Sequence, residues 1–464
     1  WGEAMATGPN INVTSKGRAV MSDADRQAAF AAITRAQELA ETATPEEQAL
    51  IAAMAARYNG DPATSREPLD IAYAEAMGDY VAAHPADDDA AAMYAEAWMN
   101  TMPWDYWSAD GAPKPETVKV IESLEGIIDR SPEHPLALHL YIHAVEASQN
   151  PGRAEDEADR LANLVPGSGH LVHMPAHIYW RVGRYDDAAK ANITAASVDE
   201  DYIAQCNAQG FYPALYYPHN IHFLWAAASM SGQQDMAIEA GQKVADNVHM
   251  EQIEQFPTVE FFKTIPLLSL VQFGQWEDIL AAEQPPESLD YSNAIWRYAR
   301  GVAAARTGDM ESARADRKVL AGLKDSVQIS FLDTSDYPAS VLLGIADALL
   351  QGEIAMAEGS PDQAIPHFAA AVAAQDSLPY MEPPFWYYPT RQSLGEAYIA
   401  AGEFAEAEAV YKKDLEDYPR NGWSMSGLVK ALESQDKSEE AAAVQEKFDI
   451  VWRHSDVDLD GSRL

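Results

Sequence analysis

Apolar positions recur every three or four residues along most of this chain, the spacing of one face of an α-helix. Ala407 and Tyr411, for example, are separated by one helical turn. Gly, Pro or Asp separates such segments, and no run alternates long enough to predict a sheet. The predicted fold class is therefore all-α. In the N-terminal part the pattern predicts helices over residues 24–41, 45–58, 66–83 and 87–101.

The clearest repeating unit spans residues 391–419. A first helix carries Leu394, Gly395 and Tyr398, and Gly402 ends it. The second helix carries Ala407 and Tyr411 and ends before Pro419. This unit resembles the tetratricopeptide repeat, in which small residues let paired helices approach and large residues fill the groove between them. The same helix-ending glycine recurs, with more degenerate neighbours, at Gly183, Gly232, Gly274, Gly308 and Gly359.

The resemblance covers most of the chain and implies a right-handed superhelical solenoid of helix pairs. Three parts are expected within one continuous solenoid: degenerate repeats over 1–114, histidine-rich repeats over 115–250, and C-terminal repeats over 251–464. An aromatic insertion, residues 201–218, interrupts the middle part and contains Phe211. We interpret it either as a lid or binding loop or as packing over a groove.

The charge balance limits the partners. The chain has 464 residues, 32 Lys and Arg against 72 Asp and Glu, and a formal net charge of −40. Such a charge argues against nucleic acid and anionic membranes as partners. No stretch of about 20 apolar residues was found, so no membrane insertion is expected. The single cysteine, Cys206, excludes an internal disulfide and cysteine-based metal sites.

Histidines cluster in the middle of the chain. Eight of the 12 lie between residues 134 and 222. His173 follows His139 by 34 residues, and His177 follows His143 by the same interval, which is one tetratricopeptide period. Each pair therefore occupies the same place on successive first helices. The resemblance places such positions on the concave groove. The full set predicted there is His139, His143, His170, His173, His177, His219 and His222.

Imidazoles that converge from adjacent helices can hold a transition-metal ion, which we expect to be Cu, Zn or Fe. Glu146 lies one turn after His143, and we predict that it is a ligand or a general base. Four further side chains beside the histidines are predicted to bind substrate, with the arginine fixing a carboxylate: Tyr141, Arg181, Tyr216 and Tyr217.

The sequence thus predicts a metal-binding repeat protein, with a metalloenzyme acting on a small molecule as one form of that function. The alternative is a metal-free scaffold that binds a peptide or small ligand in the concave groove, and an assembly scaffold with a protein partner is also compatible. The pattern does not decide whether the chain is an enzyme. Because the chain begins at Trp1, we expect a truncated or processed N-terminus, which leaves periplasmic, secreted and cytoplasmic locations open.

Overall fold

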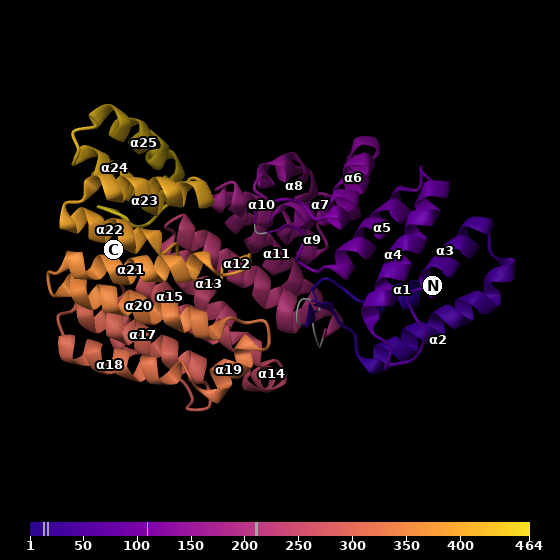
Figure 1. Cartoon of the computed structure of the whole chain (residues 1–464), viewed down its shortest axis with the longest axis horizontal. Helices are drawn as coiled ribbons and strands as arrows, with labels where there is room; N and C mark the ends of the chain where they lie inside the picture. The colour runs from indigo at the N-terminus through magenta and orange to yellow at the C-terminus, as the bar shows by residue number, and fades with distance from the viewer. Residues whose placement is uncertain (13, 16–17, 109, 209–211) are drawn as a thin grey trace. The chain divides into compact units, whose positions relative to one another are not determined.

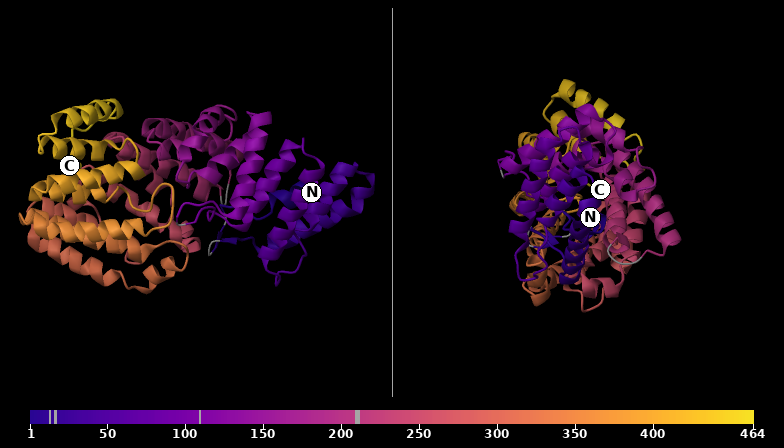
Figure 2. Two further views of the ribbon diagram at one scale, coloured as in Figure 1. Left: turned by 45° about the horizontal axis from the view of Figure 1, so that its top comes forward. Right: turned by 90° about the vertical axis from the view of Figure 1, so that its right-hand side faces the viewer.

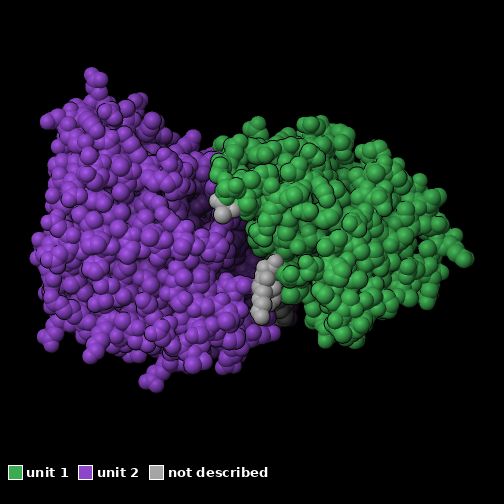
Figure 3. All heavy atoms as spheres, in the orientation of Figure 1, with its two compact units in different colours: residues 1–165 green, residues 166–464 purple. Residues whose placement is uncertain are grey.

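The computed structural model describes residues 1–12, 14–15, 18–108, 110–208 and 212–464. The chain divides into two compact units: unit 1 is Trp1–Val165 and unit 2 is Pro166–Leu464, coloured separately in Figure 3. In each unit, helices pack mainly against their neighbours in sequence (Figures 1 and 2). The prediction of an all-α solenoid is therefore confirmed.

Unit 1 begins with a short helix and a two-stranded hairpin, and the rest is helical. Its elements are α1 (Gly2–Ala6), β1 (Thr14–Ser15), β2 (Arg18–Ala19), α2 (Asp23–Leu39), η1 (Ala40–Thr42), α3 (Pro45–Ala55), α4 (Arg66–Ala83), α5 (Asp88–Thr101), α6 (Pro115–Arg130), α7 (Pro135–Val145), η2 (Pro151–Ala154) and α8 (Glu155–Leu161). The four N-terminal helices predicted from periodicity correspond to α2, α3, α4 and α5, within a few residues at each end.

Unit 2 contains seventeen α-helices within its described residues, with two short η segments. They are α9 (Gly169–His173), α10 (Pro175–Arg181), α11 (Tyr185–Cys206), η3 (Tyr212–Tyr216), α12 (Tyr217–Met230), α13 (Gln234–Asp246), α14 (Met250–Gln255), η4 (Pro257–Thr264), α15 (Ile265–Gln272), α16 (Trp276–Ala281), α17 (Asp290–Arg306), α18 (Met310–Leu323), α19 (Val327–Asp333), α20 (Ala339–Ala357), α21 (Pro361–Asp376), α22 (Arg391–Ala401), α23 (Phe404–Asp417), α24 (Gly422–Glu433) and α25 (Ser438–Val451).

Local sequence fixes where these helices begin and end. At the start of α3, Thr44 and Glu47 form a capping box, each side chain bonding the other's backbone N–H, and Pro45 occupies the first helical position. At the end of α22, Gly402 adopts a left-handed conformation (φ 79°), which a residue with a Cβ rarely adopts. The other predicted helix-ending glycines also have positive φ: Gly183, Gly232, Gly274, Gly308 and Gly359.

The core of the C-terminal repeat depends on one tyrosine and two glycines. Tyr411 on α23 is fully buried. A Cβ added at Gly395 on α22, or at Gly427 on α24, would lie 2.4 or 2.3 Å from the Tyr411 ring. The glycines therefore allow three successive helices to enclose the ring. This is the packing that the small and large positions of the repeat predicted.

The structure differs from the sequence prediction at residues 201–218. Residues 201–206 complete α11, and residues 212–218 belong to η3 and the first turn of α12, so most of the predicted loop is helical. The acidic and aromatic residues of this segment are compatible with a helix, and the aromatic count alone does not indicate a loop. Phe211 lies outside the described residues.

One described helix, α20, is long and apolar enough to cross a membrane, which the sequence analysis did not find. Of its most apolar 18-residue window, 67% is buried within the structure, and α20 packs against α17 and α21. Burial of this kind is typical of a core helix in a repeat array.

Candidate metal centre

Three histidines of unit 2 converge from α9, α10 and α12. His173 ends α9 and His177 lies in α10, and Pro175 separates the two helices because it has no N–H to donate. Met174 between them keeps helical angles (φ −49°, ψ −40°), so His173 and His177 remain one turn apart on the same face. His219 lies in the first turn of α12, which follows α11 and packs against it.

The three imidazoles lie close enough to share an ion. One ring nitrogen from each of His173, His177 and His219 lies within 4.8 Å of the others. The Nε2 atoms of His173 and His177 are 2.9 Å apart. Ring centroids are separated by 4.8 Å between His173 and His219, and by 5.9 Å between His177 and His219. His173 is fully buried, and His177 is 5% exposed.

Asn192 on α11 determines which nitrogen of His173 carries the proton. The Asn192 Nδ2 group donates to the Ala188 carbonyl at 2.8 Å, so its Oδ1 faces His173. His173 Nδ1 lies 2.7 Å from that oxygen and must donate to it. The lone pair of His173 is therefore on Nε2, which points toward His177.

Glu382 faces the second imidazole. Its Oε2 lies 3.3 Å from Nδ1 of His177, and its Oε1 accepts a hydrogen bond from the Tyr380 hydroxyl. A carboxylate opposite Nδ1 favours a proton on that nitrogen and leaves the Nε2 lone pair of His177 for an ion. The two Nε2 atoms lie 2.9 Å apart, and their donor and acceptor roles depend on the tautomer of His177. A proton or a metal cation between them would remove the repulsion of two facing lone pairs.

Burial keeps His173 in the form that binds metals. Desolvation lowers its pKa well below the usual value, and the neighbouring His177, His219 and His170 lower it further. A neutral imidazole is the ligand form, because a protonated nitrogen has no lone pair to donate.

Two predicted ligands of unit 2 lie outside this group. His170 in α9 contacts the ring of Tyr216 at 5.0 Å and that of His173 at 6.1 Å, measured between centroids. His222 stacks on Trp225 at 5.3 Å and lies against Phe261 and Phe262.

His222 lies in an aromatic environment, apart from the three converging histidines. Burial among these aromatic rings lowers the pKa of His222 to about 3, with no other cause contributing. Because three helical steps rotate a side chain by about 300°, His222 and His219 face directions about 60° apart. We therefore leave His222 out of the proposed ligand set.

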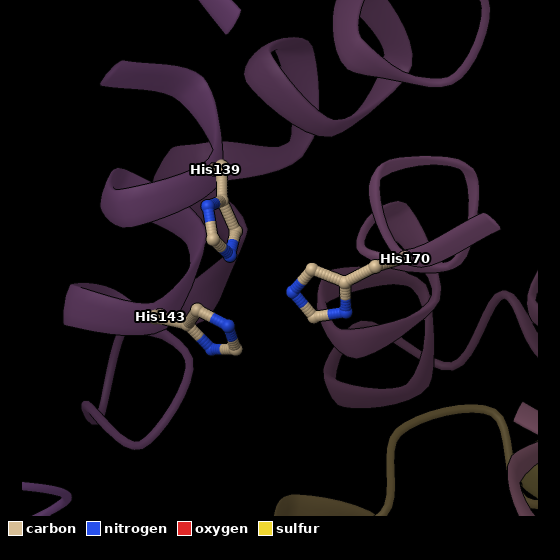
Figure 4. A group of neighbouring side chains, drawn as sticks. All are labelled: His139, His143 and His170. Carbon is tan, nitrogen blue, oxygen red and sulfur yellow. The ribbon is translucent and has the colours of Figure 1, made fainter. Parts of the chain in front are cut away.

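Unit 1 holds a smaller donor group. His139 and His143 project from the same side of α7, with ring centroids 4.9 Å apart (Figure 4). Nδ1 of His143 lies 2.8 Å from Oε1 of Glu146, and both side chains are buried. Trp104, at φ 63°, presents its ring edge-to-face to His143 at 5.0 Å. Glu146 is thus placed to orient His143.

The predicted substrate-binding residues take different positions. Tyr141 donates to Glu125 and accepts from Arg153 within unit 1. Tyr217 donates to Glu200 at 2.9 Å. Arg181 lies over the ring of Tyr380 at 5.3 Å and lines a cleft of about 230 Å³ in unit 2.

The sequence analysis missed Asn192 and Glu382. Asn192 lies in an ordinary helical segment, and Glu382 is 205 positions after His177 in a proline-rich loop. Neither shares the repeat phase of the histidines, so spacing gave no signal for them.

Residues 390–420 match the family model of the tetratricopeptide repeat. This span contains α22 and α23, the helix pair in which Tyr411 of α23 packs against Gly395 of α22. The chain is therefore an all-α solenoid that carries a tetratricopeptide repeat. A search of curated proteins found no match to the sequence.

Solved structures of low identity resemble the chain. Human IFIT1, in a dimer with m7Gppp-AAAA, is 12% identical with a TM-score of 0.35, and the match covers 92% of this chain and 86% of IFIT1. Yeast Tom70 is 12% identical with a TM-score of 0.30, over 83% of this chain and 89% of Tom70. Both similarities concern the fold and extend to no ligand.

Proposed function

We propose that this solenoid binds a transition-metal ion through His173, His177 and His219. The observation that carries the proposal is the convergence of three ring nitrogens within 4.8 Å of one another. The hydrogen bond that His173 donates to Asn192 supports it, because metal-ligating histidines usually donate their other N–H to an oxygen that fixes the ring.

The separation of the two Nε2 atoms can be compared with the geometry that each metal prefers. An ion at about 2.05 Å from two nitrogens that are 2.9 Å apart subtends an N–metal–N angle of about 90°. That angle is typical of tetragonal or octahedral coordination, as in Cu(II) or Fe(II) sites. Tetrahedral zinc requires a separation of about 3.3 Å, which the two rings reach by moving apart by about 0.4 Å. Imidazole ligands suit copper, iron and zinc alike, so the titrations described below distinguish them.

Three protein ligands leave coordination positions open for water or a small molecule. Catalytic metal sites have this arrangement, whereas structural zinc sites are closed by four protein ligands. A metalloenzyme acting on a small molecule is accordingly the form of the function that we propose.

The group of unit 1 extends the proposal to a second donor set. His139 and His143 supply imidazoles, and Glu146 supplies a carboxylate that also holds His143. Mixed imidazole and carboxylate ligands on one helix suit iron and zinc. The contribution of this group is measured by comparing the number of ions bound per chain in the wild type and in His143→Gln.

Metal analysis of untagged protein tests the proposal. After removal of metals with a chelator, the protein is titrated calorimetrically with Cu(II), Fe(II) under anaerobic conditions, and Zn(II). We expect stoichiometric binding in the wild type. His173→Gln and His219→Gln should lose more than about 100-fold in affinity, beyond the 10–100-fold typical of residues that only orient a ligand.

His367→Gln is the matched control, because His367 lies in α21, outside the groups of potential ligands found among the described residues. Circular dichroism and thermal melting establish that each variant is folded. Absence of stoichiometric binding for all three metals, or equal affinity in folded His219→Gln and His367→Gln, would contradict the proposal.

A further inference from the structure

Residues 452–464 fold back across unit 2 as an irregular segment after α25 ends at Val451. Figure 1 shows the chain returning from α25 to the side of α22. The segment is held at two anchors. The first lies at the turn between α12 and α13, and the second is the Gly-Ser-Arg segment, residues 461–463, which contacts α15, α22, α23 and α24.

The first anchor is a carboxylate at the start of a helix. Oδ1 and Oδ2 of Asp456 accept from the backbone N–H groups of Gln234 and Asp235 at 2.5 and 3.1 Å. The N–H of Asp456 donates to the Gly232 carbonyl at 3.2 Å. The first N–H groups of a helix have no acceptor within it, and the helix dipole favours a negative charge there. Asp456 therefore ties the segment to α13 independently of the second anchor.

Ser462 sits on buried polar groups of α22 and α23. Its Oγ donates to the Gln392 carbonyl at 2.8 Å and lies 2.7 Å from the Tyr411 hydroxyl oxygen. Its N–H donates to Oε2 of Glu396 at 3.3 Å. Ser462, Gln392 and Tyr411 are all fully buried. The site therefore supplies partners to both the hydroxyl and the backbone of one serine.

The neighbouring position is built for a guanidinium. Arg463 lies over the ring of Tyr388, with Cζ 3.9 Å from the ring centroid, and its Nη1 donates to Oε1 of Gln272 at 3.3 Å. Tyr388 and Gln272 are 2% and 3% exposed. A planar guanidinium stacks on an aromatic face while it donates hydrogen bonds in its own plane, which an ammonium group cannot reproduce. The site therefore prefers arginine to lysine.

The position before the serine requires glycine. Gly461 has φ 141°, a conformation that residues with a Cβ rarely adopt. A Cβ added there would lie 2.8 Å from Oε2 of Glu396. The N–H of Gly461 donates to Oγ of Ser426 on α24 at 3.3 Å. Backbone conformation, hydroxyl and guanidinium together specify the order glycine, serine, arginine.

The link between the two anchors is short, exposed and acidic. It consists of residues 457–460, in which Asp458 and Asp460 are exposed. Lys430 donates to the Asp460 carbonyl at 2.8 Å. Segments with little buried apolar surface open at low cost, and repulsion within a chain of charge −40 favours opening further. The Gly-Ser-Arg segment can therefore detach while Asp456 keeps it near its site.

We propose that the Gly-Ser-Arg segment is an internal ligand that covers a peptide-binding site of unit 2, and that the site binds a Gly-Ser-Arg sequence of a partner protein when the internal one detaches. The occupant is specified by the segment that the structure seats there. Tethering gives the internal segment an effective concentration in about the millimolar range, so a partner must compete with it. This autoinhibition goes beyond the metal site and does not depend on it.

Fluorescence anisotropy tests the proposal with a labelled peptide of residues 457–464, acetylated and amidated, in the presence of a metal chelator. Two variants of the full chain release the site: Arg463→Ala removes the stacked guanidinium, and Gly461→Ala strains the backbone of the internal segment. We expect both to bind the peptide saturably in the micromolar range. The wild type should bind it at least about tenfold more weakly, because its own segment competes.

Controls separate specific from general effects. Arg453→Ala is the matched control, because Arg453 is exposed in the same segment and contacts His454 at 3.0 Å. It should bind the peptide as the wild type does. With Arg463→Ala as the receptor, a peptide with Lys in place of Arg should bind at least about threefold more weakly, and one with Ala in place of Gly at least about tenfold more weakly. Circular dichroism and thermal melting show whether each variant is folded.

Four results would overturn the proposal. The first is no saturable binding by either folded releasing variant up to about 1 mM protein. The second is equal affinity in the wild type and the releasing variants, and the third is equal affinity for the peptides with Lys or Ala. The fourth is loss of the folded state in both releasing variants, which would make the segment a fixed part of the fold. Because a chelator is present throughout, failure of the metal proposal leaves these outcomes unchanged.

Discussion

Replacing Asn192 with leucine removes the hydrogen bond that orients His173 while keeping a side chain of similar size. The lost contact is the 2.7 Å bond between His173 Nδ1 and Asn192 Oδ1, inside a fully buried region. Loss of such an orienting partner typically lowers metal affinity by about 10–100-fold, or about 1.4–2.7 kcal/mol. The buried N–H of His173 is also left without its acceptor, which should lower the free energy of unfolding by about 1–3 kcal/mol.

Asn192→Asp separates orientation from packing. The aspartate keeps an acceptor for His173 and adds a negative charge that strengthens the donor character of the imidazole. In calorimetric titration of metal-free protein, Asn192→Asp should therefore bind the metal at least as tightly as the wild type. Asn192→Leu should bind it more weakly than the wild type. Asn293→Leu is the matched control, because Asn293 also donates to the carbonyl of the preceding turn, at 2.8 Å, but contacts no histidine among the described residues.

The control should lose stability without losing metal affinity. If folded Asn192→Leu binds metal within about twofold of the wild type, the assigned tautomer of His173 does not matter for binding. The reasoning from Asn192 to the lone pair on Nε2 would then be refuted.

Three further predictions concern stability and the limits of the site. His222→Phe should leave metal affinity unchanged in calorimetry, because His222 packs among aromatic rings; a loss above about tenfold would return it to the ligand set. Gly395→Ala should lower the free energy of unfolding by about 1–3 kcal/mol, measured by urea denaturation, because the new Cβ would meet the Tyr411 ring at 2.4 Å; an unchanged midpoint would show that the ring can move. Burial raises the pKa of Asp414 to about 7. Between about pH 4 and about pH 7, the folded state therefore keeps a proton that the unfolded state has lost. The contribution of Asp414 to stability falls as pH rises through that range, by up to a few kcal/mol. Denaturation curves across that range should therefore show Asp414→Asn gaining stability relative to the wild type as pH rises, and a constant difference would contradict the assignment.

Periodicity was sufficient to predict the helices because each helix buries one stripe of apolar residues against its neighbours in sequence. The helix-ending glycines and the role of Tyr411 followed from the same local pattern. The prediction was wrong for most of residues 201–218, because residues 201–206 belong to α11 and residues 212–218 belong to η3 and the first turn of α12. Aromatic content is compatible with either structure, so it does not locate a helix end.

Spacing along the chain also placed His173 and His177 together, since residues four apart share a helical face. Spacing did not distinguish His219 from His222, because both lie in the first turns of α12 and only packing decides which neighbour each side chain meets.

The sequence by itself determined an acidic, all-α repeat protein with imidazoles in helical phase. Only the tertiary structure decided which imidazoles converge, which nitrogen of His173 faces the others, and how an aromatic cleft forms near Glu382. The physical reason is that helix periodicity is a local property of the backbone. The orientation of an imidazole depends instead on single contacts, such as the hydrogen bond that His173 donates to Asn192 and the approach of Glu382 to His177, which form only when the helices pack.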